Sequence, residues 1–278
     1  YYPDQLDHLS SCKSPHEMFG AILKSYYAKK VGVNPEDMFV VSIMPCSCKK
    51  YEKNRPEMEV NGLRDVDAVL TTRELGKLIK RSGINFKKLP DEDFDKDIVH
   101  DYSGAGVIFG VTGGVMEAAL RTAYKVLTGK EREGVIFNEV RGFETIREAE
   151  FELGGKNIKV AVTSGMKGAK ALLDQIRKGE SPYTFIEIMG CPGGCVNGGG
   201  QPYVREAFLQ DEDPDIMETY VEKRAKALYS EDERQTLRQS HNNPQIIDLY
   251  KEFLGEPNSH RAHELLHTTY NPDRKRFD

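Results

Sequence analysis

The sequence predicts an α/β fold in which buried strands alternate with helices and a helical segment follows at the C-terminal end. Three observations support this class. Apolar runs at residues 38–45 and 185–189 have the length of strands, residues 14–31 and 115–127 carry apolar side chains at helical spacing, and the chain from about Asp213 onward is charged and helical in pattern. With 278 residues, the chain is long enough for two lobes.

Each element has a local signal in the sequence. Ser14 and Pro15 can begin the first helix, and Thr72 is the expected cap of a helix over 73–82. The run 38–45 is expected to be a buried strand because it is almost continuously apolar. The other expected elements are strands over 67–72, 134–140, 158–163 and 185–189, a surface loop over 85–101, and helices over 115–127 and 167–178.

Composition argues against several classes of protein. The net charge of −5 provides no basic field for nucleic acid or acidic membranes, and no apolar run approaches the roughly 20 residues that span a bilayer. Five cysteines are an odd number in a long chain, which favours thiols or metal ligands in a reducing, cytoplasmic compartment over a disulfide framework. The chain opens at Tyr1 without a Met or a signal peptide, so we expect the protein to continue upstream.

The strongest chemical signal lies in residues 185–202. An apolar strand leads into Cys191 and Cys195, and glycines surround the second cysteine. Thiolates bind soft metals, and glycine lets the backbone approach a bulky group. The paired spacing of zinc fingers and the C-x-x-C of thioredoxin-type sites are both absent. We therefore expect an iron–sulfur cofactor here; the alternative is two structural thiols in a glycine-rich turn.

A second candidate site follows the strand 38–45. Cys46 comes at the C-terminal end of this strand, where ligands bind in open α/β sheets. Lys49 could donate hydrogen bonds to an anionic ligand, and Glu52 could hold a charge partner. The alternative is a solvated basic turn after a strand end. The glycines of 104–114 fit neither the dinucleotide fingerprint nor the Walker loop, and indicate backbone that passes close to a buried body.

His263, Glu264 and His267 match the H-E-x-x-H signature of zinc metallopeptidases, which places two imidazoles on one face of a helix. A third downstream ligand could only be Asp273 or Asp278. The surrounding helix is polar and near the chain end, and so short a pattern arises readily by chance. We therefore expect a packed or surface helix and keep the peptidase as a remote alternative.

Taken together, the motifs resemble the iron-only (FeFe) hydrogenases. Met44-Pro-Cys-x-x-Lys-x-x-Glu52 is similar to the second signature of that family, and Glu187-x-Met-x-Cys191-x-Gly-Gly-Cys195-x-x-Gly-Gly-Gly-Gln-Pro202 to the third. Tyr102-Ser-Gly-Ala-Gly, Gly113-Gly-Val-Met-Glu-Ala-Ala and Arg261-Ala-His-Glu also fit. The resemblance covers nearly the whole chain and implies the iron-only hydrogenase fold, with two α/β lobes around a buried cofactor. It implies an H-cluster catalytic domain over residues 1–205 and a helical C-terminal belt, similar to a small subunit, over 206–278.

The resemblance also implies a reaction and a cofactor. The reaction is the reversible reduction of protons to H2, and the cofactor is the H-cluster, a 4Fe–4S cubane linked through a cysteine sulfur to a di-iron unit with CO, cyanide and a bridging dithiolate. By motif position, Cys46, Cys191 and Cys195 would be cubane ligands, and Cys195 would bridge to the di-iron unit. Lys49 would hydrogen-bond an iron-bound cyanide. The remaining implied site residues are Ser10 as a proton-relay hydroxyl, His16 where Gln is usual near the cluster, and Met44, Pro45, Met189 and Phe109 as the apolar pocket lining.

The sequence departs from the family in three ways. The first family signature, Thr-Ser-Cys-Cys-Pro, does not occur in these 278 residues. It supplies the fourth cubane ligand and a proton-delivering cysteine, so this chain alone is not expected to assemble an active cluster. His16 replaces a Gln, and Cys12 and Cys48 are extra thiols.

The resemblance implies partners and leaves alternatives open. Electrons are expected from ferredoxin or from a nicotinamide-linked electron-transfer subunit, and the cofactor would need maturation proteins. The alternatives are a hydrogenase-like, non-catalytic iron–sulfur protein and a sensory hydrogenase, in which slow turnover feeds a signalling domain.

Overall fold

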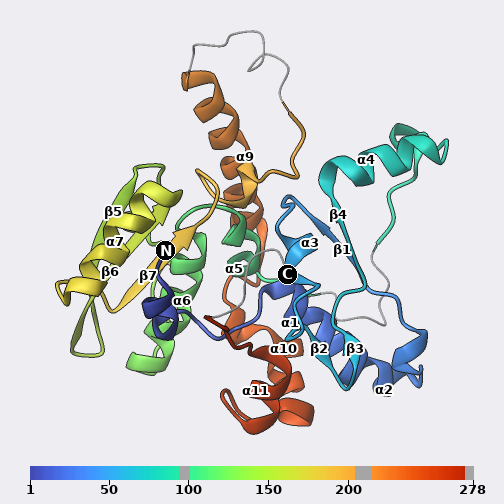
Figure 1. Ribbon diagram of the computed structural model, residues 1–278, viewed down its shortest axis with the longest axis horizontal. Helices are drawn as coiled ribbons and strands as arrows, with labels where there is room; N and C mark the ends of the chain where they lie inside the picture. The colour runs from blue at the N-terminus through green and yellow to red at the C-terminus, as the bar shows by residue number, and fades with distance from the viewer. Residues whose placement is uncertain (94–100, 204–213, 273–278) are drawn as a thin grey trace. The chain divides into compact units, whose positions relative to one another are not determined.

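The computed structural model describes residues 1–93, 101–203 and 214–272 of the chain. The chain forms two compact units (Figure 1): unit 1 consists of residues 1–100 and 248–278, and unit 2 of residues 101–247. Each unit contains both helices and strands, as the predicted α/β class requires. The predicted division at 205/206 lies outside the described residues and stays a prediction.

Unit 1 is built on a short parallel sheet. Strand β1 (Val41–Met44) pairs with β4 (Ala68–Thr71), and β2 (Glu59–Val60) forms an antiparallel hairpin with β3 (Leu63–Arg64). Sequence patterning placed a buried strand over 38–45, and this prediction is wrong in two respects. The strand begins only at Val41, and the side chains of Val41 and Ile43 are 45% and 41% exposed. Apolarity alone does not reveal that one face of a two-stranded sheet is left uncovered.

The helix predicted over 14–31 is confirmed as three consecutive segments, α1 (Pro15–Ile22), the π-helical turn η2 (Leu23–Tyr27) and α2 (Ala28–Val31). Helix α1 packs tightly against the chain near Asp65, because a Cβ at Gly20 would lie 2.2 Å from the Asp65 carbonyl oxygen. Its other partners are C-terminal: α11 (His260–Leu266) and the π-helical turn η9 (Tyr250–Leu254). The core of unit 1 consists of Ile22, Leu249, Leu254 and Leu265.

The remaining helices of unit 1 are short, apart from α4. They are α3 (Lys49–Glu52), α4 (Thr72–Arg81), and the 3-10 helices η1 (Pro3–His8), η3 (Pro35–Asp37) and η4 (Phe86–Lys88). The expected loop over 85–101 is exposed as far as residue 93, and 94–100 lie outside the described residues.

Unit 2 contains a three-stranded sheet. Strand β6 (Lys156–Ser164) is central, antiparallel to β5 (Ile146–Leu153) and parallel to β7 (Phe185–Met189), with α7 (Met166–Lys178) as the crossover. Helix α6 (Gly114–Thr128) packs on this sheet, and the shared core is Met116, Leu120, Phe137, Val140, Leu153, Val160 and Val162. The helices predicted over 115–127 and 167–178 and the strands over 158–163 and 185–189 are confirmed.

The strand predicted over 134–140 is wrong. Only the 3-10 helix η6 (Asn138–Val140) forms there; Phe137, just before it, and Val140, its last residue, enter the core. The true partner of β6 is β5, whose residues 146–153 alternate between half-buried and charged side chains. Alternation is the signal of a half-exposed strand, and the glutamates in this segment obscured it.

The other elements of unit 2 surround the start of α6. They are α5 (Gly104–Val107), η5 (Ile108–Gly110), η7 (Cys195–Asn197), α9 (Pro214–Arg234) and η8 (Ser240–Asn242); α10 (Pro244–Leu249) joins the two units in sequence. Helix α9 packs through Val221 and Ala225 on Val111 and Val196. None of the helices described is both long and apolar enough to cross a membrane.

The start of α4 gives a first testable prediction. Thr71, rather than the predicted Thr72, is the cap: Thr71 Oγ1 accepts the Glu74 N–H, and the Glu74 carboxylate accepts the Thr71 N–H. Thr71→Ala should lower the free energy of unfolding by about 1 kcal/mol. The substitution removes the hydroxyl that accepts the Glu74 N–H, and the reciprocal bond of the capping box is then less well positioned. Urea unfolding followed by circular dichroism measures the loss. Thr72→Ala is the matched control, and an equal loss there would contradict the assignment.

Candidate metal centre

Cys191 and Cys195 lie on the turn that follows β7 in unit 2. The Gly194 N–H donates to the Cys191 carbonyl oxygen at 3.0 Å, and Cys195 begins η7. Both side chains are half-buried, and none of the five cysteines, all of which are described, forms a disulfide. One short turn therefore presents two thiols, as the predicted ligand pair requires.

Two glycines of this turn cannot be replaced without moving the backbone. Gly193 and Gly194 have φ values of +78° and +98°, which favour glycine. A Cβ at Gly194 would lie 2.7 Å from Thr112 N, and a Cβ at Gly193 would lie 2.5 Å from Val221 Cγ1. The Thr112 N–H also donates to the Gly193 carbonyl oxygen at 3.1 Å. The turn is thus packed directly on the chain that precedes α6.

Glu187 on β7 fixes the strand to the start of α6. Its buried carboxylate accepts the backbone N–H groups of Gly113 at 2.6 Å and Met116 at 2.7 Å. Burial raises the pKa of Glu187, while these two N–H groups lower it. The sequence placed Glu187 in a motif but gave it no role. A charged residue inside an apolar strand could have indicated that its carboxylate is buried and hydrogen-bonded. The predicted lining residues Met189, at the end of β7, and Phe109, in η5, are half-buried.

The second half of the predicted site lies in unit 1. Strand β1 ends at Met44, and Pro45 and Cys46 follow; all three side chains are half-buried. Lys49 begins α3, and its Nζ lies 2.6 Å from Glu52 Oε2; the sequence indicated a charge partner for Glu52 without identifying it. Burial acts to raise the pKa of Glu52, but hydrogen bonds and charge from His16 and Lys49 outweigh it and lower this pKa to about 2.

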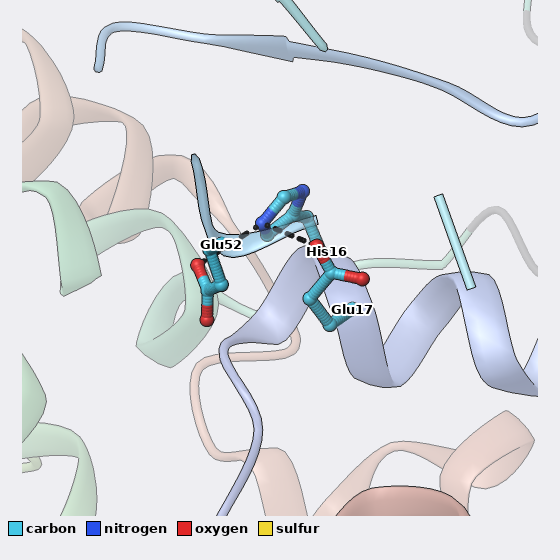
Figure 2. Close-up of side chains that lie close together, drawn as sticks. All are labelled: His16, Glu17 and Glu52. Atoms are coloured by element: carbon cyan, nitrogen blue, oxygen red, sulfur yellow. Dashed lines mark hydrogen bonds and ion pairs between the residues drawn. The ribbon is translucent and has the colours of Figure 1, made fainter. Parts of the chain in front are cut away.

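His16 joins two carboxyl groups in a buried cluster (Figure 2). Its Nε2 lies 3.4 Å from Glu52 Oε2 and 3.3 Å from Glu17 Oε1, and its Nδ1 lies 3.1 Å from Ser42 Oγ. Among the residues that the structure describes, this is the one group of three or more His, Cys, Asp or Glu whose ligand atoms lie within 4.8 Å of one another. The sequence singled out His16 but not Glu17. The position of Glu17 beside His16 at the start of a helix could have indicated that it belongs to the same cluster.

Two further predicted positions lie elsewhere in unit 1. Ser10 is exposed; its Oγ accepts the Cys12 N–H at 3.3 Å, and its carbonyl oxygen accepts the Tyr270 hydroxyl at 2.8 Å. The H-E-x-x-H motif lies on the expected helix, α11, which ends at Leu266. His267 follows with extended backbone, and its N–H donates to the His263 carbonyl oxygen at 3.2 Å. The rings of His263 and His267 stack with centroids 4.0 Å apart. Asp273 and Asp278, the possible third ligands, lie outside the described residues.

Each unit, taken by itself, presents side chains of the kind that a cysteine-ligated iron–sulfur cofactor needs. Cys191 and Cys195 come from one glycine-lined turn in unit 2, and Cys46 follows a strand end in unit 1 with a lysine one helical turn away. Thiolates are the ligands of iron–sulfur clusters, and an ammonium group suits an anionic ligand on such a metal centre.

The fold and the donor set define a class of iron–sulfur α/β proteins, and comparison with known proteins defines the family. Residues 1–199 match the family model described as iron only hydrogenase large subunit, C-terminal domain, and residues 218–273 match iron hydrogenase small subunit. The chain therefore belongs to the iron-only hydrogenase family, as its motifs predicted.

Individual relatives agree with the family. The chain is 50% identical to the NADP-reducing hydrogenase subunit HndD of Solidesulfovibrio fructosivorans over 97% of its length, and 33% identical to Protein NAR1 of Arabidopsis thaliana over 96%. It spans about half the length of these relatives, 44% and 57% respectively. A variant of the FeFe-hydrogenase HydA1 from Chlamydomonas reinhardtii superposes with a TM-score of 0.79 at 42% identity, covering 97% of this chain and 72% of that one. The predicted fold class is confirmed.

Proposed function

We propose that this chain forms the larger part of the cofactor-binding region of a hydrogenase, an enzyme that interconverts two protons and two electrons with H2. The observation that carries the proposal is the turn from Cys191 to Cys195, in which glycines and Glu187 hold two thiols on packed backbone. Family membership and the match of this turn to the third hydrogenase signature support it.

The cofactor that these residues would hold is the H-cluster, a 4Fe–4S cubane joined to a di-iron unit with CO, cyanide and a bridging dithiolate. Cys46, Cys191 and Cys195 would ligate the cubane, with Cys195 also bridging to the di-iron unit. When bound, this group supplies the redox chemistry at which protons and electrons combine.

The chain's own side chains would bind and orient that group. The Lys49 ammonium would donate to an iron-bound cyanide, and the 2.6 Å contact with Glu52 holds this ammonium in position. Half-buried Met44, Pro45, Met189 and Phe109 would exclude water and competing ligands. The exposed hydroxyl of Ser10 would accept and donate a proton on the way to the site.

The proposal extends to partners and compartment. Ferredoxin or a nicotinamide-linked electron-transfer subunit would supply electrons, and the name of the HndD relative, an NADP-reducing hydrogenase subunit, supports the second. Maturation proteins would deliver the di-iron unit. A reducing, cytoplasmic compartment suits three ligand thiols.

The test joins the chain to a Thr-Ser-Cys-Cys-Pro segment from a relative, matures the protein anaerobically, and measures H2 evolution from a reduced viologen. Cys195→Ser should abolish both activity and the infrared bands of iron-bound CO and cyanide, because the bridging sulfur is lost. Exposed Cys12 gives the matched control, and Cys12→Ser should retain both signals. Bands that survive Cys195→Ser would show that the bridging assignment is wrong.

A second candidate is a hydrogenase-like iron–sulfur protein without turnover. The observation that favours it is the 33% identity to Protein NAR1 over 96% of this chain. The same preparation distinguishes the two functions: cubane absorbance without di-iron bands after maturation supports the second candidate. A verified di-iron unit without H2 evolution refutes the catalytic proposal.

A further inference from the structure

Glu17 is a buried carboxyl group without a hydrogen-bond donor. Its side chain is 0% exposed, and neither carboxylate oxygen has a hydrogen-bond partner. A carboxylate in such a position is strongly disfavoured, because burial removes its hydration and nothing replaces it. Glu17 must therefore carry a proton or face a cation, which is either a bound ion or the protonated imidazole of His16 at 3.3 Å.

The position of His16 shows which of the two carboxyl groups, Glu17 or Glu52, lacks a hydrogen-bond donor. Its Nε2 faces both carboxyls, at 3.3 Å from Glu17 and 3.4 Å from Glu52, and a single nitrogen presents at most one hydrogen. Glu52 has a second donor, Lys49 Nζ at 2.6 Å, and its side chain is 18% exposed to water. Glu17 has neither compensation. Two carboxyls that share one donor cannot both be ionised at low cost, so the proton belongs on Glu17.

We propose that Glu17 and His16 form a buried proton-holding pair, in which the Glu17 carboxyl carries a proton that it can pass to the His16 imidazole. In this transfer the Glu17 O–H bond breaks and an N–H bond forms at Nε2; no electron is gained or lost. The product is a carboxylate facing an imidazolium, and the reverse step restores the acid.

The surrounding charges support this assignment. Burial, followed by the carboxylates of Glu52 and Asp65, raises the pKa of Glu17 to about 7, against the opposing charges of Lys13 and Lys49. Lys13 is itself held by Asp65 at 2.6 Å, so it does not neutralise Glu17. With His16, these are the titratable groups that face Glu17 from α1, from α3 and from the chain near Asp65.

A divalent cation fits the cluster less well than a proton. The distances of 3.3 and 3.4 Å would suit ligands around a small cation. However, the Glu52 oxygen that would bind the cation already lies 2.6 Å from the Lys49 ammonium, which would repel it. A proton on Glu17 satisfies the buried oxygen without displacing Lys49.

The pair deepens the proposed function, on which this step rests, because it lies beside the lysine that would contact the cofactor. A proton on His16 gives Glu52 a cationic partner on its other side and weakens its hold on Lys49. Partly exposed Glu52 connects His16 to solvent. The pair would thus keep a proton in reserve near a reaction that consumes two.

The first test uses the chain without its cofactor, so its result does not depend on the outcome of the hydrogenase assay. Infrared spectra recorded near pH 6 should contain the carbonyl band of a protonated carboxylic acid. Glu17→Gln should remove this band, whereas the exposed matched control Glu36→Gln should retain it. A band that is absent from the wild-type chain, or that persists in Glu17→Gln, overturns the proposal.

The second test follows stability against pH. Because the folded state holds this proton more tightly than the unfolded chain, the contribution of Glu17 to the free energy of unfolding falls as pH rises from 4.5 to about 7. Glu17→Gln should lose this decline and be the more stable protein above pH 7, while Glu36→Gln should follow the wild type. Parallel curves for wild type and Glu17→Gln would refute the buried acid.

The third test addresses the cation directly. Chelator-treated chain is titrated with Co²⁺, whose spectrum with nitrogen and oxygen ligands lacks the intense sulfur charge-transfer bands of cysteine sites. We expect no uptake that depends on Glu17. Uptake of one equivalent with a nitrogen–oxygen spectrum, lost in Glu17→Gln and accompanied by loss of the acid band, would replace the proton with a metal site.

Discussion

Replacing Arg121 with Met should lower the free energy of unfolding by about 3–5 kcal/mol, because it breaks a buried ion-pair network. Asp232 and Glu117 would each keep only one arginine partner, Arg238 and Arg141 respectively. The Arg121 side chain is completely buried; it contacts both oxygens of Asp232 at 2.8 and 2.9 Å and Glu117 Oε1 at 2.8 Å. Burial opposes ionisation of Asp232, but hydrogen bonds from Arg121 and Arg238 lower its pKa. The network joins α6 to α9 within unit 2.

Urea unfolding at neutral pH measures this loss, and an exposed ion pair provides the control. Lys170 and Asp174 lie 2.5 Å apart on the surface of α7 at i,i+4 spacing. Lys170→Met should cost no more than about 0.5 kcal/mol, because water solvates both partners. Equal losses for Arg121→Met and Lys170→Met would show that the buried network contributes nothing beyond a surface pair.

Local patterns in the sequence were sufficient for many elements of the fold. Five elements lie close to their predicted ranges: helices α1, α6 and α7 and strands β6 and β7. Their sequences contain long segments with helical periodicity or short apolar runs, and both patterns directly indicate which side chains are buried. The errors occur where burial depends on distant neighbours. Within residues 134–140, Phe137 and Val140 enter the core although no strand forms. Strand β1 remains half-exposed because its sheet has only two strands among the described residues.

The candidate site was predictable as a set of motifs but not as a set of contacts. Motif spacing singled out Cys191, Cys195 and Cys46 as candidate ligands. The sequence also singled out Lys49 and Glu52, but only the structure shows that they contact each other at 2.6 Å. The role of Glu187 could not be predicted, because its two donors are backbone N–H groups more than 70 positions away in the sequence. Glu17 was missed for the same reason: only the fold shows that both of its oxygens are buried and lack donors.

The backbone of the cysteine turn leads to the last and most direct prediction. Gly194→Ala should remove most of the iron bound at this turn, because Gly194 combines φ of +98° with close backbone neighbours. The new Cβ would lie 2.7 Å from Thr112 N and 2.8 Å from the Gly110 carbonyl oxygen, closer than real Cβ contacts allow. An alanine in this backbone conformation (φ +98°, ψ −164°), which is essentially restricted to glycine, costs about 1–3 kcal/mol by itself, and the clash must also displace the turn from the chain that precedes α6.

A neighbouring glycine separates local geometry from a general effect of substitution. Gly190 lies at the end of the same strand, but its φ is not left-handed, and a methyl group added at its Cα would meet nothing within 4 Å among the described residues. Gly190→Ala should therefore bind iron as the wild type does, whereas Gly194→Ala should lose most of the cubane absorbance per chain when both are matured with the Thr-Ser-Cys-Cys-Pro segment. If Gly194→Ala keeps its iron, the two thiols do not need this turn, and the rigid-turn argument for the ligand pair fails.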